Sequence, residues 1–314
     1  MSHAVLARVV RSGFLESVHH GSAVALDASG HVVVALGDPR APVFPRSSAK
    51  PLQAVAMLRA GLALNGPLLA LAAASHSGER FHLDGVGRIL AGAGLVPDDL
   101  QNSVDLPLDE QERVAWHCAG REPSALAQNC SGKHAAMLAT CVENGWPTAT
   151  YREPDHPLQL LIAETIAELA GEPIAATGVD GCGAPLFAVS LAGLARAFSR
   201  LATGRHGSAE QRVANAVRTY PEWLGGTGRD VTVLIRALPG VIAKDGAEAV
   251  YAAALPDGSS AALKIADGGQ RARPVVMAAL LHKLGAAADL LDELAEVPVL
   301  GRGEPVGRVE AVPM

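Results

Sequence analysis

The pattern of apolar and polar residues predicts strands near both ends of the chain and helices between them. Short apolar runs rich in β-branched residues and bounded by turn residues are typical of strands. The runs of this kind are residues 4–10, 22–26, 31–36, 230–235, 250–255 and 262–265. Turn residues at 27–30 and at 256–258 each separate two such runs, and each arrangement predicts a hairpin.

Helical spacing dominates the middle of the chain. In residues 50–62, apolar side chains recur at Leu52, Val55 and Ala56, and Pro51 is compatible only with a first helical turn. The other segments that we predict to be helical are residues 81–95, 110–119, 132–143, 157–170, 185–201 and 209–223.

The predicted elements together indicate a mixed fold. The short apolar run 68–74 predicts a buried strand that ends at Ser75. We expect an α/β (α+β) fold whose sheet is formed by the N- and C-terminal segments, with a helical section inserted between them. No repeat or flexible linker divides the chain, so residues 1–314 should form one unit, with room for two closely packed subdomains.

Composition excludes two classes of partner. Of the 314 residues, 49% are hydrophobic and 18% are charged, and the formal net charge is -6 with no basic run. Nucleic-acid binding requires clustered Lys and Arg that contact phosphates, so we expect no nucleic-acid partner. No apolar stretch reaches the roughly 20 residues of a membrane helix, and residues 1–13 lack the apolar segment of a signal peptide. We therefore expect a cytoplasmic protein with no membrane partner.

Four cysteines in a chain of this length favour reduced thiols over a disulfide framework. Cys130 precedes a predicted helix that carries Lys133 and His134, and Cys182 follows Asp180 by two residues. Zinc takes Cys and His ligands, but two cysteines so far apart are a weak metal signal. A soft metal site and a pair of small buried residues beside a polar site both remain open.

Ser47 and Lys50 form a Ser-x-x-Lys pattern at the start of a predicted helix, and the spacing of three places them on one helical face. A lysine whose pKa is lowered by burial can take the proton of a serine. Serine near a helix start is also a common cap, so the pattern alone leaves both interpretations open. Ser75 and Lys244 follow apolar runs and add a second serine and lysine, in the order that Ser-Lys acyl-transfer enzymes use.

Several longer motifs, taken in order, resemble the asparaginase II family, the thermolabile rhizobial type. The motifs that carry the resemblance are residues 46–53, 74–79, 129–134, 155–159 and 180–185. The resemblance continues through residues 243–248 and 255–258 and so spans nearly the whole chain.

The resemblance implies hydrolysis of L-asparagine to L-aspartate and ammonia, on a fold similar to serine β-lactamases and glutaminases, in a homodimer. It also implies two Ser-Lys pairs, in which Ser47 pairs with Lys50 and Ser75 pairs with Lys244. The pattern does not decide which serine attacks the amide.

The resemblance further implies how the substrate is held. Asp180 would bind the α-amino group, and Arg46 and His76 would be further substrate-binding residues. One position departs from the family pattern, because Asp105 stands where many relatives have a histidine. This departure leaves the preference between asparagine and glutamine open.

A zinc ion is the cofactor that the resemblance implies, with Cys130, Lys133 and Cys182 as its ligands. It would favour substrate binding, because the Ser-Lys pairs already supply a nucleophile. Two other functions fit parts of the sequence. One is a Ser-Lys amidase, glutaminase or lactam hydrolase that acts on another amide, and the other is a catalytically silent binding protein with the same fold.

Overall fold

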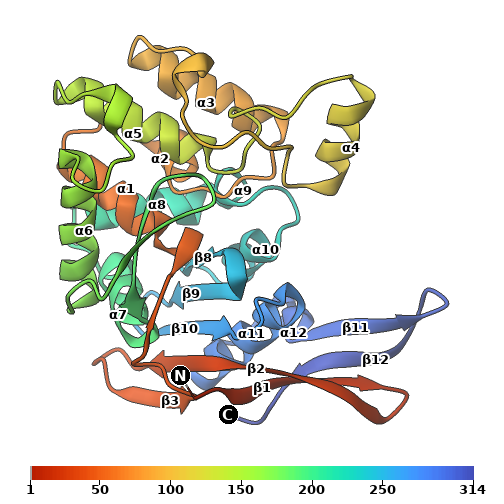
Figure 1. Cartoon of the computed structure of the whole chain (residues 1–314). Coiled ribbons are helices and arrows are strands. Elements are labelled where there is room, and N and C mark those ends of the chain that lie inside the picture. The colour runs from red at the N-terminus through yellow and green to blue at the C-terminus, as the bar shows by residue number, and fades with distance from the viewer. Residues whose placement is uncertain (1) are drawn as a thin grey trace.

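The computed structural model describes residues 2–314 and combines a long antiparallel sheet with a layer of helices (Figure 1). The strands of the main sheet are β1 (Ala4–Arg11), β2 (Phe14–Leu26), β3 (Val32–Leu36), β8 (Ile242–Asp245), β9 (Val250–Ala254), β10 (Ser260–Ile265), β11 (Glu296–Gly301) and β12 (Glu304–Ala311). The four short strands that form two separate two-stranded sheets are β4 (Pro42–Val43), β5 (Thr177–Val179), β6 (Pro185–Phe187) and β7 (Val189–Ser190).

The main sheet joins the two ends of the chain. Its strand order is β11-β12-β1-β2-β10-β9-β8, and β3 pairs with β2. The first half of the long strand β2 pairs with β1, and its second half pairs with β10, which comes from the C-terminal part of the sequence. The prediction of an α+β fold, with a sheet from both chain ends and helices inserted between them, is confirmed.

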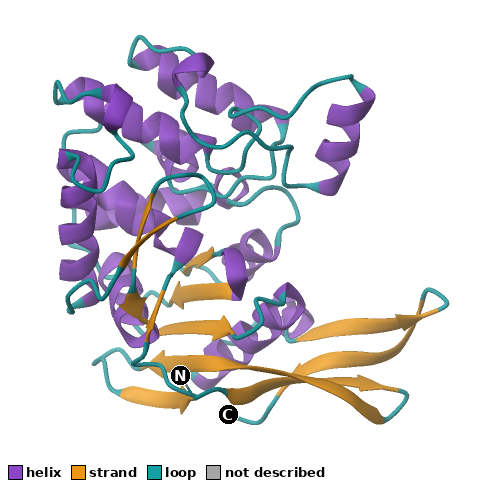
Figure 2. Ribbon diagram, in the orientation of Figure 1, coloured by secondary structure: helices purple, strands orange, loops and turns teal. Residues whose placement is uncertain are grey.

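Within residues 2–314 the chain forms twelve α-helices. Most of them lie between β4 and β8 in the sequence, and Figure 2 shows them packed above the sheet. In the first half of the sequence these are α1 (Lys50–Arg59), α2 (Gly66–Ala72), α3 (Arg80–Gly92), α4 (Glu110–Cys118), α5 (Ser131–Glu143) and α6 (Pro157–Ala170). In the second half they are α7 (Leu191–Ala202), α8 (Ala209–Thr219), α9 (Pro221–Leu224), α10 (Asp230–Ala237), α11 (Arg273–Lys283) and α12 (Asp289–Leu294). None of the helices within residues 2–314 is long and apolar enough to cross a membrane.

Helix α1 is the centre of the helical layer. Every residue from Lys50 to Leu58 is buried, because helices α2, α5, α6 and α8 pack around α1 on several sides. Pro51 occupies the first turn, where its missing N–H leaves no hydrogen bond unmade, as the sequence predicts. Helices α7 and α11 pack against the strands of the main sheet, and α7 also contacts α6 and α8 of the helical layer. The start of α1 therefore lies in the protein interior, where a polar side chain needs partners.

Two segments predicted to be strands are helices. Residues 68–74 lie mostly in α2, and residues 230–235 lie in α10. A short apolar run looks the same in a buried strand and in a buried helix, so periodicity cannot separate them. In α10 the β-branched residues Val231, Thr232 and Ile235 are buried together with Leu234 on a helical face, and this packing outweighs their preference for strands.

Two predicted helices have different limits in the structure. The segment 185–201 begins with strands β6 and β7, and its helix starts only after Ser190, whose side chain caps the N–H of Gly193. The segment 209–223 breaks at Tyr220, because Pro221 begins the separate helix α9. Strands β11 and β12 and helices α11 and α12 were not predicted from the sequence.

A pair of helical glycines allows the packing of the helical layer to be tested. A Cβ atom on Gly132, in α5, would lie 2.5 Å from the carbonyl oxygen of Leu71, whereas a Cβ on Gly87, in α3, would meet nothing within 4 Å. We expect Gly132→Ala to lower the free energy of unfolding by about 1–3 kcal/mol through steric strain. Gly87→Ala should raise it by about 0.5–1 kcal/mol, because alanine restricts the unfolded chain. Urea unfolding of both variants is the measurement, and equal effects would contradict the close approach of α2 and α5.

Candidate active site

Ser47 lies in a tight turn that precedes α1. It belongs to the 3₁₀ helix η1 (Arg46–Ala49), and the first N–H groups of such a helix have no partner within the helix. Arg46 has a φ of 52°, a left-handed conformation that costs a non-glycine residue about 1–2 kcal/mol. Gly246, just after β8, packs against this turn, since a Cβ there would lie 3.4 Å from the backbone nitrogen of Ser47. The turn therefore presents Ser47 where the helical layer meets the sheet.

The side chain of Lys50 is buried and pairs with Ser75. Its Nζ donates hydrogen bonds to the carbonyl oxygen of Ala74 at 2.5 Å, to Ser75 Oγ at 3.1 Å and to Cys130 Sγ at 3.0 Å. Among the described residues the Lys50 amine makes no hydrogen bond to the Ser47 hydroxyl, and only the backbone N–H of Lys50 donates to the carbonyl oxygen of Ser47. The buried amine needs acceptors, and the loop after α2 and the start of α5 supply them. The lysine of the expected Ser47 pair thus contacts the other serine.

Lys244 is the second buried lysine, at the end of β8. Its Nζ donates to the carbonyl oxygen and to Oδ1 of Asp245, at 2.7 and 2.6 Å. Burial lowers the pKa of Lys244, the Asp245 carboxylate opposes this shift and the positive charge of Lys50 adds to it, and together these effects bring the pKa to about 8. The described residues show no hydrogen bond between Lys244 and Ser75, so the second expected pair is not formed directly.

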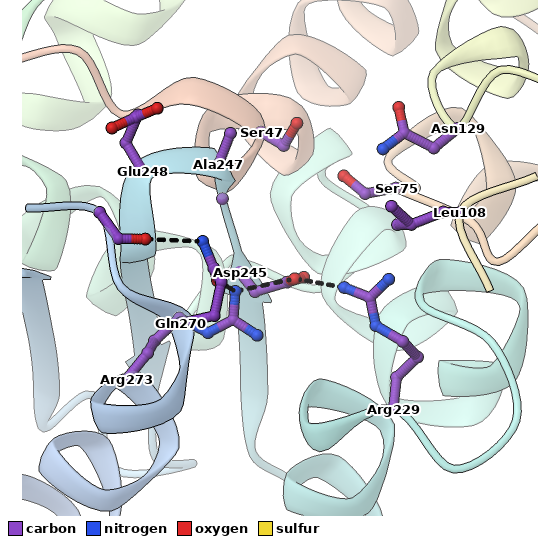
Figure 3. A pocket seen from close by; sticks show the side chains of 12 residues that line it. Ser47, Ser75, Leu108, Asn129, Arg229, Asp245, Ala247, Glu248, Gln270 and Arg273 are labelled. Atoms are coloured by element: carbon purple, nitrogen blue, oxygen red, sulfur yellow. Dashed lines mark hydrogen bonds and ion pairs between the residues drawn. The ribbon is translucent and has the colours of Figure 1, made fainter. Parts of the chain in front are cut away.

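Ser47 and Ser75 open into the same cavity, which has a volume of about 590 Å³ (Figure 3). The lining residues are Ser47, Ser75, Leu108, Asn129, Arg229, Asp245, Gly246, Ala247, Glu248, Gly268, Gln270 and Arg273. Helix, strand and loop segments that are far apart in the sequence all contribute to this wall. The cavity thus brings two hydroxyl groups together, and a hydrogen bond links one of them to a buried amine.

A charge cluster forms the sheet side of the cavity. Asp245 accepts a hydrogen bond from Arg229 Nη2 at 2.7 Å and forms an ion pair with Arg273 Nη1 at 3.3 Å. Burial by itself would raise the pKa of Asp245, but Lys244, Arg273 and Arg229 outweigh it and hold the pKa well below the usual range. Arg229 and Arg273 were missed in the sequence, because each lies far from the motifs and carries no local signal of its own.

The three expected substrate-binding residues lie outside the lining of this cavity. Arg46 donates to Asp180 Oδ1 at 2.9 Å, and Asp180 also accepts a hydrogen bond from the N–H of Gly181. Burial would raise the pKa of Asp180, but the charges of Lys133 and Arg46 hold it below its ordinary value. His76 is fully buried and hydrogen-bonds to Ser131 Oγ at 2.9 Å.

Asp105 lies in the loop that follows α3. Its backbone pairs with Ser124, and its carboxylate accepts a hydrogen bond from the N–H of Leu106. Leu108, three residues further along the chain, lines the cavity, and Pro107 packs against Gly78. The departure from the family pattern therefore falls in the loop that forms one edge of the cavity.

The structure brings Cys130, Lys133 and Cys182 together. Lys133 Nζ donates to Cys182 Sγ at 3.2 Å, and the two cysteines lie in one buried cluster. A hydrogen bond from Cys182 and the charges of Lys50 and Lys133 lower the pKa of Cys130, whereas the same hydrogen bond raises the pKa of Cys182. Burial would lower the pKa of Lys133, but the negative charge of the two sulfur atoms raises it overall.

The cluster of Cys130, Lys133 and Cys182 contains some of the donor types that zinc prefers. In the part of the chain that the structure describes, no three His, Cys, Asp or Glu side chains are grouped as a metal site would require. His134, which the sequence places near Cys130, hydrogen-bonds to the hydroxyl of Tyr151 at 2.6 Å instead. Two sulfur atoms and the amine of Lys133 do converge, and these donor types fit zinc provided that Lys133 binds in its neutral form. All four cysteines are free thiols, as the sequence predicts.

Comparison with known proteins gives one family match. The model of the L-asparaginase II family matches residues 7–311. No curated protein sequence matches the chain significantly. Among solved structures, the chain is similar to a β-lactamase from Mycobacterium bovis, with a TM-score of 0.47 and 15% identity, covering 85% of this chain and 95% of that one.

Two further structures have comparable similarity. For a putative β-lactamase from Bacteroides dorei, the TM-score is 0.46 and the identity 14%, and the match covers 83% of this chain and 93% of that one. For EstCE1, a hydrolase with promiscuous acyltransferase activity, the TM-score is 0.45 and the identity is 12%. That match covers 85% of this chain and 93% of the EstCE1 chain.

Proposed function

The chain belongs to the L-asparaginase II family and is an amidohydrolase that acts on a small molecule, and on this premise we propose that its substrate is L-asparagine. The reaction would release L-aspartate and ammonia. The observation that carries the proposal is the hydrogen bond of 3.1 Å between Lys50 Nζ and Ser75 Oγ at the wall of a cavity that Ser47 shares. A serine and a lysine in contact are the groups that acyl transfer without a histidine requires.

Ser47 is the proposed nucleophile. Ser75 Oγ is already bonded to Lys50, whereas Ser47 Oγ makes no hydrogen bond to another described residue and faces the cavity. The free N–H groups at the start of η1 would stabilise the negative oxygen that forms when Ser47 attacks the amide carbon. In this geometry Ser47 supplies the attacking hydroxyl, and Ser75 carries the proton.

Protons would move through Lys50 and Ser75. The neutral amine of Lys50 accepts the proton of Ser47 as the oxygen–carbon bond forms. Ser75 gives its proton to the amide nitrogen and takes one from Lys50, so that the carbon–nitrogen bond breaks and ammonia leaves. Water then attacks the acyl ester, the lysine accepts its proton, and the proton returns to Ser47 as the ester bond breaks.

We also propose a zinc ion held by Cys130, Lys133 and Cys182, which converge beside the site. When bound, zinc would supply positive charge that favours substrate binding. The chain holds these donors in place, since Cys130 Sγ also accepts a hydrogen bond from Lys50.

Asp180, next to this cluster, is the proposed partner of the substrate's α-amino group, and Arg46 and His76 are proposed as further substrate-binding residues. The homodimer and the cytoplasmic location remain predictions.

Loss of the proposed nucleophile should abolish turnover. We expect Ser47→Ala to lower kcat for ammonia release from L-asparagine on the order of 10³-fold or more. Ser48→Ala is the matched control, because the Ser48 hydroxyl points to the carbonyl oxygen of Pro45 and does not line the cavity. Coupled-enzyme detection of ammonia from L-asparagine and from L-glutamine is the measurement. Near-normal turnover by Ser47→Ala would exclude this residue as the nucleophile.

The pH dependence should report on Lys244. The charges of Lys244 and Lys50 repel each other, so a protonated Lys244 opposes the uptake of the Ser47 proton by Lys50. Above its pKa of about 8 Lys244 is mostly neutral and this opposition is lost, so kcat/KM should rise through about pH 8 and then level off. The Asp245 carboxylate raises this pKa, and Asp245→Asn should therefore move the rise to lower pH. A pH–rate series on both proteins is the measurement. If the rise stays at the same pH in Asp245→Asn, Lys244 is not the group that titrates.

Metal content tests the zinc proposal independently of activity. Protein purified without chelator should contain about one zinc ion per chain by mass spectrometry, and Cys182→Ala should lose it because one of three donors is removed. Cys141→Ala is the matched control, since Cys141 is buried in α5 outside the Cys130 cluster. Equal zinc content in all three proteins would show that the metal binds elsewhere.

A further inference from the structure

Arg229 has unused hydrogen-bond donors at the cavity wall. It directly precedes α10, and its Nη2 donates to Asp245 Oδ2 at 2.7 Å. Its Nε and Nη1 have no partner within residues 2–314, and 22% of its side chain is exposed in the cavity that Ser47 and Ser75 line. Figure 3 shows the guanidinium reaching toward Asp245 at this wall. A guanidinium with two free nitrogens can bind a further carboxylate.

The other arginines near the cavity are already occupied. Arg273 bonds to Asp230 through Nε and Nη2, at 3.2 and 2.6 Å, and to Gln270 through Nη1 at 2.5 Å. Arg46 contacts Asp180 through both Nε and Nη2. Arg229 is therefore the arginine of the cavity wall that retains capacity for a new anion.

The charge balance around Arg229 favours an anion as well. Asp245 faces three cationic groups, Arg229, Arg273 and Lys244, while Asp230 pairs with Arg273 alone. The carboxylate of Glu248 also lines the cavity but lies at the opposite end from Arg229 in Figure 3. Two carboxylates, Asp245 and Asp230, thus face three cations, and Arg229 has only a share in Asp245, so it is incompletely neutralised.

We propose that Arg229 binds the α-carboxylate of the amino-acid amide substrate and so selects amides that carry this group. This inference rests on the proposed function, because the same cavity then holds the amide at Ser47. Asp245 acts as a positioning residue that fixes the guanidinium. Amides of similar size without the carboxylate are rejected, because they leave the Nε and Nη1 donors of Arg229 without an acceptor.

The matched substrate pair is L-asparagine and β-alaninamide, which is asparagine without its α-carboxylate. Arg229→Gln should lower kcat/KM for L-asparagine about 10- to 100-fold, mainly through KM, since a hydrogen bond to a charged group contributes this much. Turnover of β-alaninamide should fall far less. Arg236→Gln, at the exposed end of α10 and paired with Glu222, is the control for removing a positive charge. Equal losses for both substrates in Arg229→Gln, or no loss, would overturn the proposal.

A binding measurement separates this inference from the proposed function. In a Ser47→Ala/Ser75→Ala background, calorimetry should find L-asparagine bound about 10- to 100-fold more weakly after Arg229→Gln. Weaker binding together with a wild-type enzyme that releases no ammonia would refute the asparaginase proposal and keep the carboxylate site. Unchanged binding of L-asparagine, or no binding to the Arg229 protein, would refute the site.

A second variant, Arg229→Lys, tests the same proposal with a smaller change to the cavity wall. If Arg229→Gln does not give folded protein, Arg229→Lys retains a positive charge that can pair with Asp245 but lacks the planar fork of donors. We expect an intermediate loss for L-asparagine, larger than the loss for β-alaninamide. If Arg229→Lys discriminates between the two substrates as well as the wild type does, and its KM for L-asparagine is unchanged, the carboxylate is not bound through two nitrogens.

Discussion

The organisation of the site depends on how the buried amine of Lys50 is satisfied. A polar group without water must find acceptors inside the protein, and Lys50 finds them in Ala74, Ser75 and Cys130. These residues lie after α2 and before α5, so one side chain from α1 fixes the positions of two other segments. The serine that would carry the proton and the sulfur that would bind a metal are therefore held by the same nitrogen atom.

A second polar network lies on the sheet side. Asp245, at the end of β8, forms ion pairs with Lys244, Arg229 and Arg273, and the four side chains make a nearly buried cluster. Removing one partner of such a cluster leaves a buried charge without compensation, which typically costs about 3–5 kcal/mol. The two networks meet at Ser47, because Gly246 packs against the turn that holds it. The proposed nucleophile thus stands where the helical layer and the sheet are joined, and its position depends on both.

Local signals explain which elements were predicted correctly. Helix α6 has the predicted limits, 157–170, and in the structure His156 caps it, Pro157 occupies its first position and Gly171 ends it with a φ of 67°. Residues 230–235 carry no comparable cap, and their β-branched side chains predict a strand, yet they form α10. Packing of one helical face decides that these residues form a helix. A short apolar run does not specify this by itself, because it fits a buried strand equally well.

The sequence by itself determined the family, the order of the strands and helices in outline, and the chemical types at the site. Motifs of fixed spacing are local, so Ser47, Lys50, Ser75, Lys244 and the cysteine pair could be selected before the fold was known. Only the tertiary structure decided which of these groups touch. It paired Lys50 with Ser75 and Lys244 with Asp245, and it added two arginines to the cavity wall, because these contacts join segments that are distant in the chain and depend on how the helices pack on the sheet.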